Sequence, residues 1–199
     1  MNHDSVNLIL ASQSPRRRQL LEEAGFQFTV MAPHDDVEKA ASLELPPEQL
    51  VVESALLKAR FVARQVPSGL ILAADTVAVC GKEILGKPAS RADARRMLLM
   101  LSGQQHSVLT AICLWHRPSD CFQTHLESTK LRMDELTHEE LEAFLETGGW
   151  EGKAGAFGYQ DDLDWVHIES GLASNVVGLP VERLAEWVEQ LMATIRAVD

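Results

Sequence analysis

Cysteine is scarce in this sequence, and its three residues, Cys80, Cys113 and Cys121, are not closely spaced. The pattern indicates reduced thiols and excludes a disulfide framework or a Cys-x-x-Cys zinc site. Long apolar runs are lacking too, because no stretch approaches the ~20 residues of a transmembrane helix. The polar residues 1–4 do not follow the basic-then-apolar order of a signal peptide. We therefore expect a cytoplasmic protein with no membrane partner.

Basic charge is in short supply as well. The chain has 18 Lys and Arg residues against 29 Asp and Glu residues, a formal net charge of −11. Proteins that bind nucleic acid spread Lys and Arg over one face, so no nucleic-acid partner is expected. A phosphate ligand would need a local basic cluster. The Walker A loop and the Gly-x-Gly-x-x-Gly loop are both absent, which excludes the two commonest phosphate loops.

What is present is enough apolar sequence for one core: 46% of the 199 residues are hydrophobic, with no linker or repeat. We predict a single domain over residues 1–199. Strands and helices alternate early and strands adjoin in the middle, which favours an α/β (mixed α+β) fold, a mixed β-sheet flanked by helices. The expected strands span residues 6–11, 28–31, 70–74, 107–115, 121–133 and 165–168, and residues 77–85 are expected to form a hairpin that turns at residues 80–82. The expected helices, with their caps, span residues 14–25, 47–65, 90–103, 137–149 and 180–197.

The first candidate site is the stretch 12–18, where a strand leads into a helix that Ser14 caps and Pro15 opens. Arg16, Arg17 and Arg18 lie in its first turn. Free amide hydrogens and the helix dipole attract an anion there, and arginine binds phosphate through two hydrogen bonds. Solvated arginines are the plain alternative. Since arginine opposes the dipole unless an anion compensates, we favour anion binding for at least one of them.

Acidic residues form the second candidate. Asp75 is expected at the carboxyl end of strand 70–74, where open α/β sheets place ligands. Its carboxylate can hold Mg²⁺ and orient or deprotonate a water, although an aspartate there is also a common turn residue. Asp35, Asp36 and Glu38 can complete a cation site with Asp75, or simply be solvated.

Two lysines and a glycine-rich loop complete the candidates. Lys58 and Lys87 can balance triphosphate charge, although an isolated lysine is usually a surface residue. The glycines of residues 152–160 permit close backbone approach, and Gln160 can read a base edge through its amide.

Six short motifs in one order along nearly the whole chain resemble the Maf family of nucleotide pyrophosphatases. The resemblance implies a Maf fold, similar to inosine triphosphate pyrophosphatases, with an elongated mixed sheet and a central cleft between two lobes. The motifs lie at residues 10–17, 74–77, 86–88, 101–103, 153–160 and 175–180.

The resemblance also implies an activity. It is metal-dependent hydrolysis of a nucleoside triphosphate at the α-phosphorus, with Mg²⁺ or Mn²⁺, giving the monophosphate and pyrophosphate. Asp75 falls on the family's general base, Lys58 and Lys87 on its phosphate-site lysines, and Glu38 on its acidic-loop carboxylate. The metal ligands would then be Asp75 and Glu38, with Asp36 as the alternative to Glu38.

Further positions are implied to bind the substrate. Arg16, Thr76 and Gln160 resemble the specificity residues of the branch that hydrolyses dTTP and UTP. The chain departs from the family at Gln13, where glycine is usual, and after Gln160, where Asp161 begins an acidic run. The implied substrate-binding residues are Ser12, Ser14, Arg16, Arg17, Thr76, Lys153 and Gln160.

Two alternatives to this activity stay open. One is a nucleotide-binding regulator of cell division with little hydrolysis, and the other is a house-cleaning pyrophosphatase for modified nucleotides. A homodimer is expected only by analogy with the family.

Overall fold

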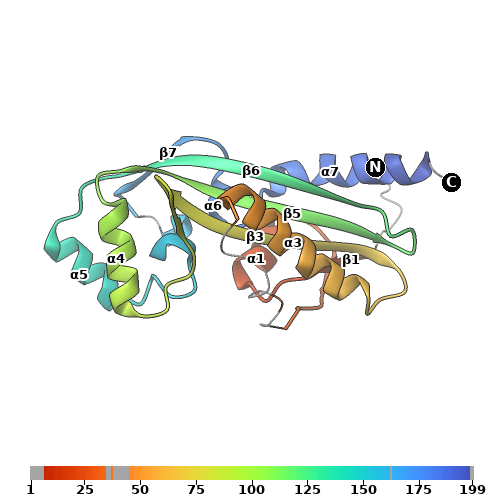
Figure 1. The fold of residues 1–199 in the computed structure, drawn as a ribbon, viewed down its shortest axis with the longest axis horizontal. Coiled ribbons are helices and arrows are strands. Elements are labelled where there is room, and N and C mark those ends of the chain that lie inside the picture. The colour runs from red at the N-terminus through yellow and green to blue at the C-terminus, as the bar shows by residue number, and fades with distance from the viewer. Residues whose placement is uncertain (1–6, 35–36, 38–44, 162, 198–199) are drawn as a thin grey trace. The chain divides into compact units, whose positions relative to one another are not determined.

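The computed structural model of the chain describes residues 7–34, 37, 45–161 and 163–197 (Figure 1). The chain divides into two compact units. Unit 1 comprises Met1–Asp75, Ala111–Leu126 and Gly178–Asp199, and unit 2 comprises Thr76–Thr110 and Glu127–Val177. The single domain with a central cleft stays a prediction.

The predicted mixed sheet is confirmed, with its strands in the order β2-β1-β3-β5-β6-β7 and β4 paired to β3. β1 pairs in parallel with β2 and β3, whereas β3 with β4 and β6 with β7 pair antiparallel. The strands are β1 (Leu8–Leu10), β2 (Phe28–Val30), β3 (Gly69–Cys80), β4 (Glu83–Leu85), β5 (Gln105–Arg117), β6 (Phe122–Met133) and β7 (Val166–Ser170).

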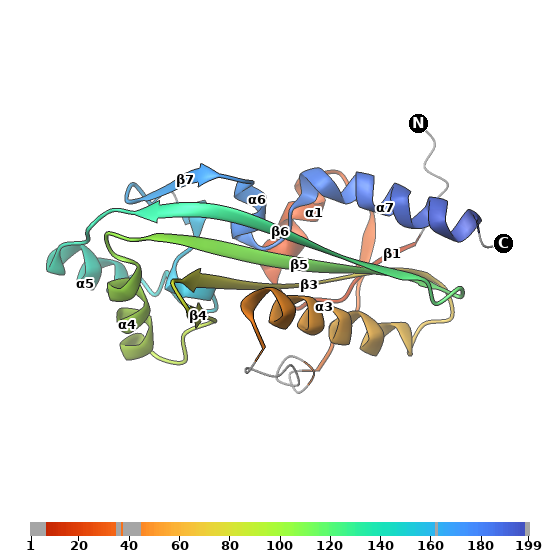
Figure 2. The same cartoon turned by 45° about the horizontal axis from the view of Figure 1, so that its top comes forward.

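In unit 1, helices cover both faces of β1 and the first half of β3. The helices α1 (Pro15–Glu23) and α7 (Val181–Arg196) lie on one side, and α3 (Pro47–Ala63) lies on the other (Figure 2). Because side chains alternate along a strand, Leu70 and Leu72 enter the core with α1 and α7, and Ile71 is buried on the opposite face. α1 begins where predicted, with the Ser14 hydroxyl accepting from the Arg17 amide at 3.5 Å.

In unit 2, the helices α4 (Arg91–Leu101) and α5 (His138–Glu146) lie side by side (Figures 1 and 2). The expected capping box of α5 is formed between Thr137 and Glu140. Ser90 caps α4 through the Asp93 amide. The short helices η1 (Ala154–Ala156), η2 (Tyr159–Asp161) and α6 (Ala173–Val177) complete the unit.

Two local expectations differ from the structure. The strand expected to end at Asp75 and the hairpin strand expected from Val77 form one continuous strand, because β3 pairs with β1 through Leu72 and then with β4 from Ala78. Asp75 therefore lies within a strand and does not follow one. The helix α6 was not anticipated, since five residues are too few to show a helical period.

The cysteines are free, as predicted, and burial raises the pKa of the Cys113 thiol to about 12. Among the described residues, no helix combines the length and the apolar character needed to cross a membrane.

Candidate active site

The start of α1 is a compact hydrogen-bonded turn. Ser12 is buried, and its hydroxyl accepts from the Ser14 amide at 3.2 Å and from the Arg17 Nη1 at 3.1 Å. Arg17 is itself 8% exposed, and its Nε donates to the Gly178 carbonyl at 2.8 Å. Arg17 thus joins the start of α1 to the segment that leads into α7, and it fixes the loop that presents the helix N-terminus.

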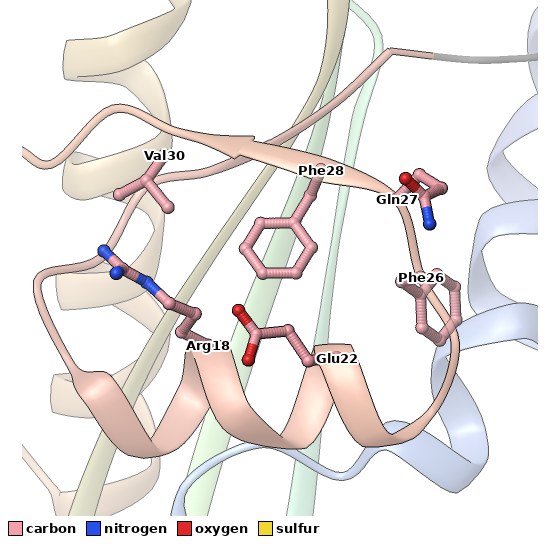
Figure 3. Close-up of a pocket in the computed structure, with 6 residues that line it drawn as sticks. All are labelled: Arg18, Glu22, Phe26, Gln27, Phe28 and Val30. Atoms are coloured by element: carbon pink, nitrogen blue, oxygen red, sulfur yellow. The ribbon is translucent and has the colours of Figure 1, made fainter.

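The other two arginines of this turn are more exposed than Arg17. Arg16 is partly exposed. Arg18 lines a hollow of about 430 Å³ between α1 and β2, together with Glu22 of the same helix and Phe28 and Val30 of β2 (Figure 3). Arg17 is therefore directed into the protein, whereas Arg18 faces this hollow. Anion binding by the partly exposed Arg16 stays a prediction.

Gln13, the departure from the usual glycine, has a defined contact. Its Nε2 donates to the carbonyl of Pro33 at 3.2 Å, so its amide fixes the buried residue that precedes the acidic loop. The acidic loop residues Asp35, Asp36 and Glu38 lie outside the described residues, and their expected roles stay predictions.

Asp75 and Lys58 meet as an ion pair. Lys58 extends from α3 with a side chain that is 3% exposed, and its Nζ lies 2.6 Å from the Asp75 Oδ1. The same ammonium lies 3.5 Å from the Ala74 carbonyl. Asp75 is 23% exposed, so its carboxylate is held from the protein side while remaining open to solvent. The pair therefore offers a fixed, accessible carboxylate at a defined position of β3.

The described residues provide only part of a binding site for a divalent metal ion. A carboxylate oxygen is a proper ligand for Mg²⁺ or Mn²⁺. Over the ranges that the structure describes, however, no group of three or more His, Cys, Asp or Glu side chains is placed to hold a metal ion. Among the described residues, Asp75 offers one carboxylate, and Glu38, the second ligand expected from the sequence, lies outside them.

Thr76 follows Asp75 on β3, and the two side chains leave the strand on opposite faces. The Thr76 hydroxyl lies 2.9 Å from the hydroxyl of Thr110 on β5, which in turn donates to the Asn175 carbonyl at 2.9 Å. The Asn175 Nδ2 donates to the Val108 carbonyl and to Thr129 Oγ1, each at 3.0 Å. Thr76 thus sits at the partly exposed end of a buried polar network in unit 2.

The glycine-rich loop is closed by an ion pair between Lys153 and Asp161. A Cβ at the buried Gly158 would lie 2.8 Å from both the Lys153 Nζ and an Asp161 carboxylate oxygen, so the pair passes directly over this glycine. Gln160 is exposed in the helix η2 beside the pair. The Gly155 amide donates to the Gly86 carbonyl at 3.1 Å, which ties this loop to the segment that carries the exposed Lys87.

The residues predicted from the sequence therefore lie in several small, separate groups of contacts. Ser12, Ser14 and Arg17 form one group, Lys58 and Asp75 a second, and the loops of Lys87 and Lys153 a third. Thr76 lies in a fourth group, the hydrogen-bond network of unit 2. Four residues of these groups were not named from the sequence as site residues. For Thr110 and Asn175 the available signal was a polar residue within an apolar run, and for Asp161 it was the departure after Gln160. The four are Thr110, Thr129, Asp161 and Asn175.

The fold and these groups define a class of protein: a mixed α/β protein with a solvent-accessible strand carboxylate and an exposed helix N-terminus on one unit. A solved HAM1 protein from Coxiella burnetii has the same fold, with a TM-score of 0.51 and 14% identity over 94% of this chain and 100% of that one. This chain belongs to the Maf-like protein family, whose match covers residues 7–191. The resemblance seen in the motifs is thereby confirmed.

This chain is also similar to proteins with a named activity. A dTTP/UTP pyrophosphatase of Rhodopirellula baltica is 49% identical over 92% of this chain and 81% of its own length. A dTTP/UTP pyrophosphatase of Ruminiclostridium cellulolyticum is 40% identical over 93% of this chain and 96% of its own length. One from Symbiobacterium thermophilum is 43% identical over 92% of this chain and 93% of its own length.

Proposed function

We propose that this protein hydrolyses nucleoside triphosphates, with dTTP and UTP as preferred substrates, to the monophosphate and pyrophosphate. The observation that carries the proposal is the Asp75 carboxylate, accessible to solvent and held at 2.6 Å by the buried Lys58. It belongs to a Maf-family chain that is up to 49% identical to relatives named dTTP/UTP pyrophosphatase. An accessible carboxylate in a fixed position is what general-base chemistry on water requires.

In the proposed reaction, Asp75 orients a water molecule and accepts its proton as the water oxygen bonds to the α-phosphorus. The bond from the α-phosphorus to the bridging oxygen breaks, and pyrophosphate leaves with that oxygen. Lys58 acts as a positioning residue, because its ammonium holds one carboxylate oxygen. When bound by Asp75 and Glu38, Mg²⁺ or Mn²⁺ would supply Lewis-acid stabilisation of the phosphate charge.

The phosphates themselves require positive groups. The N-terminus of α1 presents amide hydrogens and the positive end of its dipole, and Ser12 and Ser14 hold that turn in shape. Arg16 and Lys87 are partly exposed or exposed and can approach an anion, while Arg17 fixes the turn from within. Lys153, Thr76 and Gln160 are assigned to the remainder of the substrate, with Thr76 and Gln160 reading the base.

The experiment is pyrophosphate release by the purified protein with Mg²⁺ or Mn²⁺, using dTTP, UTP, CTP, GTP, ATP and 7-methyl-GTP in parallel. We expect turnover of dTTP and UTP above the others. Asp75→Asn should abolish turnover, and circular dichroism checks that the variant still folds when Lys58 has lost its carboxylate partner. Asp120→Asn is the matched control, because Asp120 carries an ion pair with Arg117 in the β5–β6 turn and has no assigned role.

Three results would contradict the proposal. An Asp75→Asn protein with wild-type turnover would remove Asp75 from the chemistry. Tight nucleotide binding by the wild type without any pyrophosphate release would instead favour a nucleotide-binding regulator of cell division. Faster turnover of a modified nucleotide than of dTTP or UTP would favour a house-cleaning role.

Two further expectations are tested separately. Sedimentation of the same preparation checks the homodimer expected by analogy, and fractionation of cells checks the cytoplasmic location.

A further inference from the structure

The strand β2 lies at one end of the sheet, and within the described residues it pairs with β1 alone. This pairing uses one side of its backbone. The Met31 amide donates to the Leu10 carbonyl at 3.0 Å, so Thr29, two positions earlier, also directs its amide and carbonyl toward β1. Phe28 and Val30 alternate with Thr29, and their amides and carbonyls therefore point away from β1. β2 thus presents a backbone edge that no described strand occupies.

This edge lacks the features that usually keep strand edges from pairing. Natural sheets block their edges with charged side chains, proline or bulges. β2 has the sequence Phe-Thr-Val, with neither charge nor proline, whereas β7, at the other end of the strand order, carries His167 and Glu169. The apolar side chain of Val30 is also 40% exposed. The edge of β2 is therefore suited to accept another strand.

Two opposite charges lie beside this edge. Arg18 and Glu22 extend from α1 toward β2 and line the hollow between them (Figure 3). They are about one helical turn apart, a spacing at which side chains can pair, as Gln19 and Glu23 do by a hydrogen bond at 2.8 Å. Within the described residues, however, the side chains of Arg18 and Glu22 have neither an ion-pair nor a hydrogen-bond partner. Both charges are therefore available to a second molecule.

The order of these charges is complementary to a second copy of the same surface. Because β1 and β2 are parallel and α1 connects them, α1 runs antiparallel to β2. Arg18 therefore lies toward the Val30 end of the strand, and Glu22 toward the Phe28 end (Figure 3). An antiparallel pair of β2 strands centred on Thr29 sets Val30 of each copy opposite Phe28 of the other, and their outward amides and carbonyls can then bond to each other. The same symmetry sets Arg18 of each copy opposite Glu22 of the other.

We propose that the edge of β2 and the hollow beside it form the interface of a symmetric dimer of this chain. The two-fold axis passes beside Thr29, the sheet continues from one copy into the other, and Arg18 pairs with Glu22 of the second copy. Such a contact uses the same patch on both copies and is closed, so assembly stops at two. The inference does not depend on the proposed function, because it concerns mass and not turnover.

The dimer Kd is measured by sedimentation equilibrium of the full chain, at protein concentrations from about 1 to 200 μM. Val30→Lys places a charge at the strand edge and should raise the Kd at least ~tenfold. Leu126→Lys is the matched control, because Leu126 is also 40% exposed but lies on β6, away from β2 in the strand order. We expect Leu126→Lys to leave the Kd unchanged.

The two charges provide a second test, which depends on the pairing itself. Arg18→Glu and Glu22→Arg each set like charges opposite one another across the two-fold axis, and each should raise the Kd about tenfold. The double variant exchanges the two charges, restores opposite pairs and should return the Kd to the wild-type range. Neither substitution opposes the dipole of α1, which favours an acid in its first turn and a base in its last. Circular dichroism checks that each variant is folded.

The outcomes decide the assignment. A wild-type chain that stays monomeric over the whole concentration range overturns it and leaves the edge of β2 to a strand of a different protein. A dimer that Val30→Lys weakens no more than Leu126→Lys does must form through another surface. If the double variant associates as weakly as the single ones, Arg18 and Glu22 do not face each other across a two-fold axis.

Discussion

At the scale of single residues, Lys58 shows why burial and chemistry must be weighed together. Its ammonium group is almost completely buried, and a buried charge is tolerated only with a close partner. The partner, Asp75, is the more exposed member of the pair. Removing the lysine would therefore leave a carboxylate that can turn toward water, with its position no longer fixed.

We predict that Lys58→Met reduces kcat at least ~100-fold, in the range that positioning can contribute. It should destabilise the fold by only about 1–3 kcal/mol, because Asp75 can be solvated. Steady-state kinetics and urea unfolding measure the two effects. Lys82→Met, at an exposed lysine of the β3–β4 turn, is the control and should change neither. A Lys58→Met enzyme with wild-type kcat would show that Asp75 needs no positioning.

A second prediction at this scale concerns His106 and the dependence of the unfolding free energy on pH. The residue is 5% exposed, its ring packs edge-on against Phe157 at 5.4 Å, and neither ring nitrogen has a hydrogen-bond partner of good geometry among the described residues. Burial lowers the pKa of His106 to about 4, against the weaker opposing effect of the Gln104 backbone. Below the ordinary pKa of ~6.5 the unfolded chain therefore takes up a proton that the folded protein refuses.

The stability contributed by the neutral His106 ring is fully present above pH ~6.5. It is lost as the pH falls toward 4, and the loss in the free energy of unfolding reaches up to about 3 kcal/mol. We predict that His106→Phe flattens the dependence of unfolding free energy on pH across this window. Urea unfolding between pH 7 and pH 4.5 measures it, with His138→Phe, at an exposed histidine, as the control. An unchanged slope in His106→Phe would assign the dependence to other groups.

At the scale of elements, the sequence predicted the features that depend on residues close together in the chain. The helix starts at Ser14, Ser90 and Thr137 were predictable because a capping side chain bonds to an amide only three residues away. The hairpin of β3 and β4 was predicted at residues 77–85 and is confirmed, whereas the continuity of β3 through Asp75 was not predicted, because one strand there pairs first with β1 and then with β4. Asp75 was proposed as a candidate on the expectation that it ended a strand, and that expectation was wrong.

The loop closed by Lys153 and Asp161 gives a prediction at this scale. The ion pair spans eight positions and lies over Gly158, directly beside Gln160. Asp161→Asn removes the charge but keeps the shape, so the loop loses its closing attraction. We predict a several-fold rise in KM for dTTP with kcat within about twofold, and a loss of stability below ~1 kcal/mol, as for a partly exposed pair.

Kinetics on dTTP and a thermal melt measure these changes. Asp134→Asn provides the comparison in the same unit, because Asp134 pairs with Arg132 and His167 and has no assigned role. The prediction fails if Asp161→Asn and Asp134→Asn behave alike.

At the scale of the whole molecule, family membership was evident from motifs, whereas the contacts among the motifs were not. Lys58 and Asp75 were each predicted, yet their ion pair joins α3 to β3, and sequence spacing alone does not give that contact. The Thr76–Thr110–Asn175 chain was missed because it joins residues 34 and 65 positions apart. Residue types predict which chemistry is available, and tertiary packing decides which groups act together.

The metal is the remaining element of the proposed site, and ligand binding to the intact protein tests it. A ligand that binds only the folded state, at 100 times its Kd, adds about 2.7 kcal/mol. For a chain of this length that corresponds to a rise in Tm of roughly 5–10 °C. We predict this rise for wild-type protein with Mg²⁺ and α,β-methylene-UTP, whose carbon bridge cannot be hydrolysed at the cleavage position. EDTA should remove most of the rise, because phosphate charge beside Asp75 would then be uncompensated. An equal rise in EDTA would show that the nucleotide binds through Arg and Lys side chains and the N-terminus of α1 alone, and that Asp75 serves as a base without holding a metal.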